Sequence, residues 1–197
     1  VFMVVGDLNL SRVVAYQEAN VFQWMIWKQP VAFVVFLVAA FAETNRLPFD
    51  LPESETELVG GYHTEYSSMR FAMFFLAEYF HMLTGAAFFS VLFLGGWSVN
   101  PFGGALELPM QGGLGLILLQ WGVMLGKVTL MVAFAMAVRW TLPRFRFDQL
   151  MKLAWEGMIP TALLMLLITA AFTYMGWNGA IWAGSLLCMV AMYVLGP

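Results

Sequence analysis

The stretch 24–42, WMIWKQPVAFVVFLVAAFA, indicates which solvent this chain is built for. Residues 31–42 contain no polar side chain, and Glu43 follows them directly. A helix that crosses a bilayer needs roughly 20 mostly apolar residues. Lys28 and Pro30 fall in the first turns, where a lysine can reach the interface and a proline breaks few hydrogen bonds. We therefore predict a membrane-spanning helix over residues 24–42.

The composition of the whole chain supports this prediction. Of its 197 residues, 61% are hydrophobic and 11% are charged, whereas a soluble domain carries about 25% charged residues. A chain of this size cannot hide so much apolar surface from water, which argues against a soluble enzyme and a nucleic-acid-binding protein. The single cysteine, Cys188, excludes a disulfide framework, and only two histidines accompany it, so we expect no metal site.

Further apolar stretches predict the rest of the bundle. They cover residues 71–97, 114–138 and 159–177, each long enough to span a bilayer. A last stretch, 181–195, is about 15 residues long, so it is either a short fifth span or an interfacial helix. We expect an all-α fold, in which residues 1–197 form a single membrane domain. This domain is a polytopic transmembrane helical bundle of four to five spans.

The charges are unevenly distributed between the loops. Seven of the 12 acidic residues lie in the segment from Glu43 to Glu78, and four of the nine basic residues lie between Arg139 and Lys152. Lys and Arg are enriched in cytoplasmic loops, and successive loops alternate sides. We therefore place the acidic loop 43–70 and the basic loop 139–157 together on the cytoplasmic side, or the matrix side in a mitochondrion.

The acidic loop has the composition of a proton-handling site. Six acids and two bases share residues 42–70, AETNRLPFDLPESETELVGGYHTEYSSMR. Neighbouring carboxylates raise one another's pKa and titrate as a unit, so they can take up and release protons near neutral pH. The alternative is a solvated acidic surface. Leu47, Phe49 and Leu51 alternate with the polar residues, which predicts that the loop is partly buried.

Ionisable residues also occur within the predicted spans. Glu78 lies about 12 Å into the second span, His81 follows one turn later, and Lys127 lies about 18 Å into the third. Because both depths are counted from the same side, these side chains could meet between two helices, and an ionisable residue inside a membrane suggests function. The alternatives are that Lys127 only pairs with Glu78 to hold the helices together, and that His81 only packs.

The segment 41–79, FAETNRLPFDLPESETELVGGYHTEYSSMRFAMFFLAEY, closely resembles the signature of a known family. The family is the quinone-chamber membrane subunit of respiratory complex I, NADH:quinone oxidoreductase, called the H subunit in bacteria and subunit 1 in mitochondria. Residues 142–160, LPRFRFDQLMKLAWEGMIP, resemble the loop before its last helix. Residues 8–17 and 126–130 match less specifically, so the resemblance covers most of residues 8–170.

The resemblance implies roles for individual residues. The family forms part of the quinone chamber and the acidic path that couples quinone reduction to proton translocation. Together with the ionisable residues of the predicted spans and loops, the residues that match the family form two sets of candidate site residues. The proton path and quinone chamber would contain Glu43, Asp50, Glu53, Glu55, Glu57 and Glu78. The supporting or interface residues would be Arg46, Glu65, Tyr66, Arg70, His81, Lys127, Arg144, Arg146 and Asp148.

The resemblance also implies cofactors and partners. Quinone is the substrate, this chain binds no cofactor and has no redox centre, and NADH, FMN and iron–sulfur clusters belong to partner subunits. The partners are the soluble quinone-module subunits, neighbouring membrane-arm subunits and the lipid bilayer, with no nucleic acid. We expect a bacterial plasma membrane or a mitochondrial inner membrane. A complete family member has about eight spans, so we expect a piece of a longer or split subunit, whose missing N-terminal part is a further partner.

Two other functions remain open. The acidic loop could be a docking surface that anchors the soluble arm without any proton role. The chain could also be the homologous subunit of a related hydrogenase or ferredoxin-linked complex, because the electron donor binds elsewhere.

Overall fold

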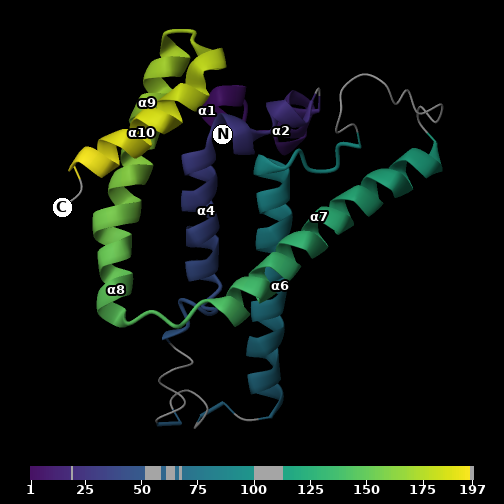
Figure 1. Cartoon of the computed structure of the whole chain (residues 1–197). Helices are drawn as coiled ribbons and strands as arrows, with labels where there is room; N and C mark the ends of the chain where they lie inside the picture. Colours follow the sequence, from purple (N-terminus) through teal and green to yellow (C-terminus); the bar gives the residue numbers. More distant parts are fainter. Residues whose placement is uncertain (19, 52–58, 61–64, 67, 100–112, 196–197) are drawn as a thin grey trace.

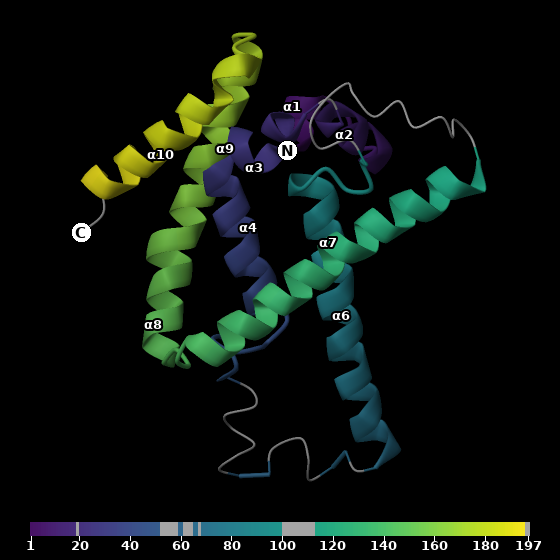
Figure 2. The ribbon, with the colours of Figure 1, turned by 45° about the vertical axis from the view of Figure 1, so that its right-hand side comes forward.

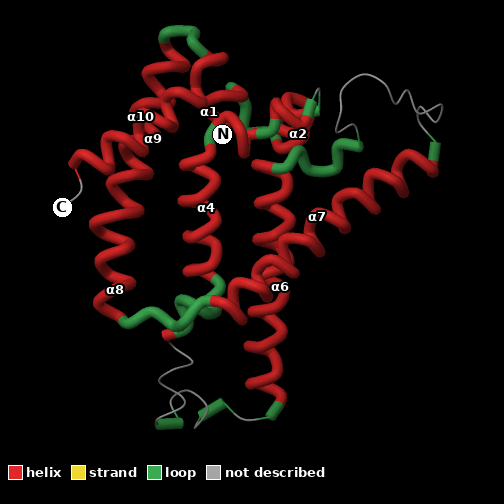
Figure 3. Tube along the Cα trace, in the orientation of Figure 1, coloured by secondary structure: helices red, strands yellow, loops and turns green. Residues whose placement is uncertain are grey.

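The computed structural model describes residues 1–18, 20–51, 59–60, 65–66, 68–99 and 113–195, without the side chains at 178 and 191–195. The regular secondary structure of these residues is helical (Figure 3). Three helical stretches are long and apolar enough to cross a membrane, namely Met69–Phe93, Leu114–Thr141 and Phe147–Tyr174, and two shorter apolar helices accompany them. The prediction of an all-α transmembrane bundle is confirmed.

The helices of the described residues differ in length and in the length of the connections between them. In order they are α1 (Phe2–Val5), α2 (Leu10–Gln17), α3 (Met25–Lys28), α4 (Pro30–Glu43), α6 (Met69–Phe93), α7 (Leu114–Thr141), α8 (Phe147–Lys152), α9 (Ile159–Tyr174) and α10 (Ile181–Leu195). A π-helical turn, Leu153–Met158, joins α8 to α9. Short 3-10 turns lie at Val21–Gln23 and Asn178–Ala180.

In space, α4 stands between α9 and α6, and α7 crosses α6 obliquely (Figure 1). Helices α1 and α2 lie at the upper end of α4, and α10 folds back along α9. After a turn of 45° the first half of α6 still extends beyond the lower end of α4 (Figure 2). At the lower end of the bundle, α6 therefore extends furthest. The loop after α4 and the start of α8 lie beside it.

The first predicted span is interrupted. It is divided into α3 and α4 by Gln29, whose backbone angles are φ −134° and ψ 63°. Pro30 is the cause, because it lacks the N–H that would continue the hydrogen-bonding pattern of α3 and its ring clashes with a helical turn before it. The same residue suits the first position of α4, where no intrahelical donor is required.

The fourth helical stretch begins earlier than expected. The sequence predicts a basic loop over 139–157, but α7 continues to Thr141 and α8 starts at Phe147. The side chain of Gln149 accepts a hydrogen bond from the Arg146 N–H at 3.2 Å, which satisfies a free donor at the start of α8. The wider π-helical turn then precedes Pro160, so the proline does not end the helix.

An apolar core fixes the upper end of the bundle. Met25, Phe89 and Phe93 are at most 2% exposed and pack with residues of α1, α4 and α10. Gln17 is fully buried among them, yet its side-chain amide donates to the carbonyls of Val91 and Leu92 and accepts from the Met25 N–H. Because this polar group is satisfied, it can hold α2 against the end of α6 without an unpaired buried atom.

A tight turn follows α6 at this end. Gly96 has φ +51°, a conformation that other residues rarely adopt, and a Cβ on it would lie 2.7 Å from a methyl carbon of Val14. Val14 is itself buried, so it cannot move aside easily. The close approach of α2 to the end of α6 therefore requires glycine here.

We expect Gly96→Ala to lower the free energy of unfolding by about 2 kcal/mol, from backbone strain and crowding against Val14. The matched control is Gly122→Ala, because nothing lies within 4 Å of a Cβ at that position of α7. Thermal unfolding of the detergent-solubilised chain measures both. Equal unfolding temperatures for the two variants would contradict this account of the turn.

Candidate functional site

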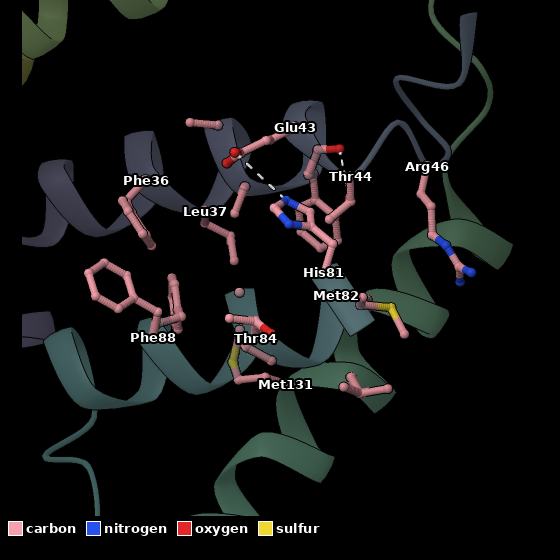
Figure 4. A pocket seen from close by; sticks show the side chains of 18 of the residues that line it. Phe36, Leu37, Glu43, Thr44, Arg46, His81, Met82, Thr84, Phe88 and Met131 are labelled. Atoms are coloured by element: carbon pink, nitrogen blue, oxygen red, sulfur yellow. Dashed lines mark hydrogen bonds and ion pairs between the residues drawn. The ribbon is translucent and has the colours of Figure 1, made fainter. Parts of the chain in front are cut away.

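A cavity of about 290 Å³ lies between α4, α6 and α7 near the lower end of the bundle (Figure 4). Its wall is mostly apolar, with Phe36 and Leu37 from α4, Phe88 from α6 and Met131 from α7. Ionisable side chains lie at one end of the lining, and they are Glu43, Arg46, His81 and Arg139. The cavity thus combines a hydrocarbon-like body with a charged mouth.

Glu43 and His81 face each other across this mouth. Glu43 occupies the last turn of α4 and His81 lies on α6, with His81 Nε2 3.8 Å from Glu43 Oε1 (Figure 4). The Glu43 side chain is 73% exposed and the His81 side chain is 46% exposed. At this distance the two atoms are not hydrogen-bonded. The contact is an ion pair only when His81 is protonated.

Arg46 and Glu78 form a closer contact beside the first. Arg46 Nε donates to Glu78 Oε1 at 2.6 Å, and the guanidinium stands 4.4 Å from the ring centre of Tyr79. Burial disfavours the charged form of Arg46, but the hydrogen bonds and charge of Glu78 and Tyr79 outweigh it and raise the Arg46 pKa. Arg46 therefore carries a fixed positive charge at the cavity mouth.

These four residues form what we call the charged row: Glu43, Arg46, His81 and Glu78. The row exists because α4 ends where it does. Thr44 caps the helix, and Asn45 follows with φ +48°, a left-handed conformation that asparagine tolerates. The chain then turns toward α6, which brings Arg46 to Glu78 and leaves Glu43 beside His81.

The next part of the acidic loop is buried against the basic loop. Asp50 is 2% exposed, and Arg144 Nη2 lies 3.5 Å from its Oδ2. The Phe145 N–H donates to the Pro48 carbonyl at 3.0 Å, and the rings of Phe49 and Phe145 stack at 5.5 Å. The predicted partial burial of the loop is confirmed for residues 47–51, whereas Val59, Glu65 and Tyr66 are exposed. The two loops share one end of the bundle, as their charges suggested.

Other predicted site residues lie apart from the row. Glu65 and Tyr66 are exposed before α6, where the Tyr66 ring packs edge-on against Phe74 at 5.1 Å. The remaining described candidates are exposed at the starts of helices: Arg70 in the first turn of α6, Arg146 before α8 and Asp148 in its first turn. Glu53, Glu55 and Glu57 lie outside the described residues.

Lys127 does not meet Glu78, and that prediction is wrong. Its Nζ donates to the carbonyls of Leu94 and Gly96 at 2.8 and 2.7 Å, beyond the end of α6. The prediction assumed that both helices enter the membrane at Arg70 and Arg139. Instead, Arg139 lines the cavity together with His81, so Lys127 lies opposite the far end of α6. Lys127 therefore stabilises a helix terminus, as cations do there.

Arg139 is the residue that the sequence analysis missed. The sequence identifies it only as a loop charge, but it lies in the last turn of α7 and lines the cavity mouth. The sequence shows that Arg139 follows Lys127 by about a dozen residues on the same helix. It does not show how α7 crosses α6, and this crossing brings Arg139 to the cavity.

The chain matches a known protein family along most of its length. The family model described as NADH dehydrogenase matches residues 1–170. The chain is 45% identical over 174 residues to NADH-quinone oxidoreductase H subunit 2 of Koribacter versatilis, covering 87% of this chain and 48% of that protein. It is 48% identical over 179 residues to the NADH-quinone oxidoreductase H subunit of Paramagnetospirillum magneticum, covering 90% and 48%. The chain spans about half the length of the curated relatives it matches.

We expect the contact between Arg46 and Glu78 to stabilise the fold measurably, unlike an exposed surface ion pair. Arg46→Gln and Glu78→Gln should each lower the free energy of unfolding by about 1–2 kcal/mol, because each leaves a partly buried charge without its partner. The double variant should cost less than the sum of the two single variants.

Arg70→Gln provides the control on the same helix, since Arg70 makes no ion pair with any residue the structure describes. Its unfolding free energy should stay within about 0.5 kcal/mol of the unmodified chain. Strict additivity of the Arg46 and Glu78 variants in detergent unfolding experiments would rule out the coupling.

Proposed function

This chain belongs to the NADH dehydrogenase family whose matched relatives are named as H subunits of NADH-quinone oxidoreductase, and from this premise we propose that it is a membrane subunit of a proton-pumping NADH:quinone oxidoreductase. In this role it forms part of the quinone-binding chamber and of the acidic path that couples quinone reduction to proton translocation. The charged row at the mouth of an apolar cavity is the observation that supports this role most strongly.

The cavity suits part of a quinone. Small-molecule sites are concave and mostly apolar, with a few polar groups that fix orientation. Phe36, Phe88 and Met131 offer hydrocarbon and aromatic surface to an isoprenoid chain, while the charged row lies at one end, where a polar head group would be recognised. Arg46 contributes a fixed positive charge toward the mouth, which attracts a reduced, negatively charged quinone species.

Coupling in this proposal is electrostatic. Quinone reduction adds charge before protons arrive, and a charge about 4 Å from another is worth about 4 kcal/mol at an effective dielectric constant of 20. That energy corresponds to about three pKa units, enough to change the protonation of a neighbouring carboxyl. Glu43 is free to respond because its only described ionic contact is the long one to His81. We extend the path to Glu78, Asp50, Glu53, Glu55 and Glu57.

Electrons and partners come from outside this chain in the proposal. NADH, FMN and iron–sulfur clusters are assigned to partner subunits, and no redox group is assigned here. The soluble quinone module binds at the lower end, where the acidic and basic loops pack together through Asp50 and Arg144. Neighbouring membrane-arm subunits and the remaining half of the relatives' length complete the chamber. The protein is integral to a membrane, which we propose is a bacterial plasma membrane or a mitochondrial inner membrane.

A docking role is the second candidate, because one observation favours it. Several predicted interface residues at the lower end are exposed: Glu65, Tyr66, Arg70, Arg146 and Asp148. Exposed charged and aromatic side chains at one end of a membrane bundle offer contacts to a soluble partner. Docking and proton coupling are separable, since the exposed residues do not belong to the charged row.

We expect Glu43→Gln and Glu78→Gln to lower quinone-linked turnover and proton translocation by about ten-fold or more in the assembled complex, because each removes a titratable carboxyl. The control is Glu18→Gln, the same chemical change at an exposed acid beside α2. Turnover, pumping in proteoliposomes and subunit content of the purified complex are the measurements.

Intact assembly with lost turnover supports proton coupling. Loss of the soluble subunits from both variants favours the docking role. Full turnover and full pumping in both variants would refute the proposed path.

A further inference from the structure

We propose that His81 is a proton-transfer residue, which exchanges a proton with Glu43 and passes it between the carboxyl and the water or ligand in the cavity mouth. This inference rests on the proposed function, because it assigns the partner with which the first acid of the path exchanges its proton.

The geometry brings a titratable acid and a titratable base to one point. His81 Nε2 and Glu43 Oε1 are 3.8 Å apart, come from different helices and both line the cavity (Figure 4). Proton transfer needs a separation of about 2.6–3.2 Å, or one bridging water. A side-chain rotation or a single water molecule closes the observed gap. Both side chains are partly exposed in the isolated chain, so packing among the described residues does not enclose the pair.

The other polar groups of the mouth are already engaged or fixed in charge. Arg46 is held by Glu78, and Arg139 carries a guanidinium, a side-chain group that does not give up its proton in proteins. The hydroxyl groups of Thr44 and Thr84 donate to carbonyls of their own helices, at 3.1 and 2.9 Å. Within the described lining, the pair of Glu43 and His81 is therefore the one whose proton can move.

The charges around His81 come from every helix that lines the mouth. Glu43 faces it from α4, Arg46 and Arg139 line the same cavity from the segment after α4 and from α7, and Glu78 precedes it by one turn on α6. Two arginines and two carboxylates balance formally, so one proton added to the Glu43–His81 pair changes the net charge of the mouth by one unit. A charge change of this size is the signal that the proposed coupling requires.

The chemistry suits an imidazole. It changes charge between about pH 5 and 8 and can accept a proton at one nitrogen while releasing another from the second. In the forward step the carboxylic acid of Glu43 loses a proton to Nε2, giving a carboxylate and an imidazolium. The imidazolium then releases a proton from Nδ1 to water or to a reduced ligand in the cavity. The imidazole, then protonated at Nε2, must turn or exchange protons with water to regain its starting tautomer. Glu43 is reloaded from the other acids of the proposed path, and no electron is exchanged.

A packing role alone does not explain this position. A packing histidine is normally buried and bonded to the backbone, whereas His81 is 46% exposed and Glu43 is its polar partner among the described residues. Truncating a packing residue would change stability. Removing a proton carrier would change the pH dependence of turnover.

The experiment compares His81→Asn, Glu43→Gln and the double variant in the assembled oxidoreductase reconstituted in proteoliposomes. Asparagine keeps a polar side chain of similar size but does not titrate. Quinone-linked proton translocation is measured between about pH 5 and 8, the range in which an imidazole changes charge. We expect His81→Asn to flatten the pH profile and to lower translocation by about ten-fold. The double variant should be no slower than the slower single variant, because both residues serve one step.

A second variant keeps the test decisive if asparagine disturbs the fold. His81→Ala opens space beside the cavity, and free imidazole added to the buffer should restore at least half of the lost translocation. Normal pH dependence in His81→Asn, or additive losses in the double variant, overturns the role of His81. If the His81 variants behave normally while Glu43→Gln and Glu78→Gln are impaired, only this inference fails. If all of them are fully active, the proposed function fails as well.

Discussion

The hydrogen-bonded ion pair between Arg46 and Glu78 is the contact on which the candidate site depends. A charge near a low-dielectric boundary is costly unless it is paired, so this contact determines where the segment after α4 can lie. With Arg46 held against α6, the last turn of α4 is drawn to the same helix, and Glu43 reaches His81. The apolar cavity then lies directly behind these charges, which gives the site its two contrasting halves.

The two ends of the bundle are stabilised in different ways. The upper end is held by aromatic packing, the fully bonded side chain of Gln17 and the Lys127 ammonium on the carbonyls after α6. The lower end is held by the pairs Arg46–Glu78 and Arg144–Asp50. A change of protonation can therefore alter contacts at the lower end while the upper end keeps the helices in place.

The sequence predicted the helices well because apolar length is a local property. It did not place the break at Gln29, because one proline at the start of an apolar run fits either a continuous or a divided helix. It could not predict the contact of Asp50 with Arg144, which are far apart in the chain, nor the position of Lys127, which depends on how α7 crosses α6. The acids Glu43, Asp50 and Glu78 were identified from their surroundings in the sequence, but their basic partners required the fold.

In the proposed mechanism, carboxyls of the charged row change protonation when the quinone substrate is reduced. Redox-induced infrared difference spectroscopy of the assembled complex measures this directly, through the carbonyl stretch of protonated carboxylic acids. We expect a carboxyl signal on quinone reduction that is absent from Glu43→Gln. An unchanged carboxyl signal in Glu43→Gln, or no carboxyl signal in the unmodified complex, would contradict it.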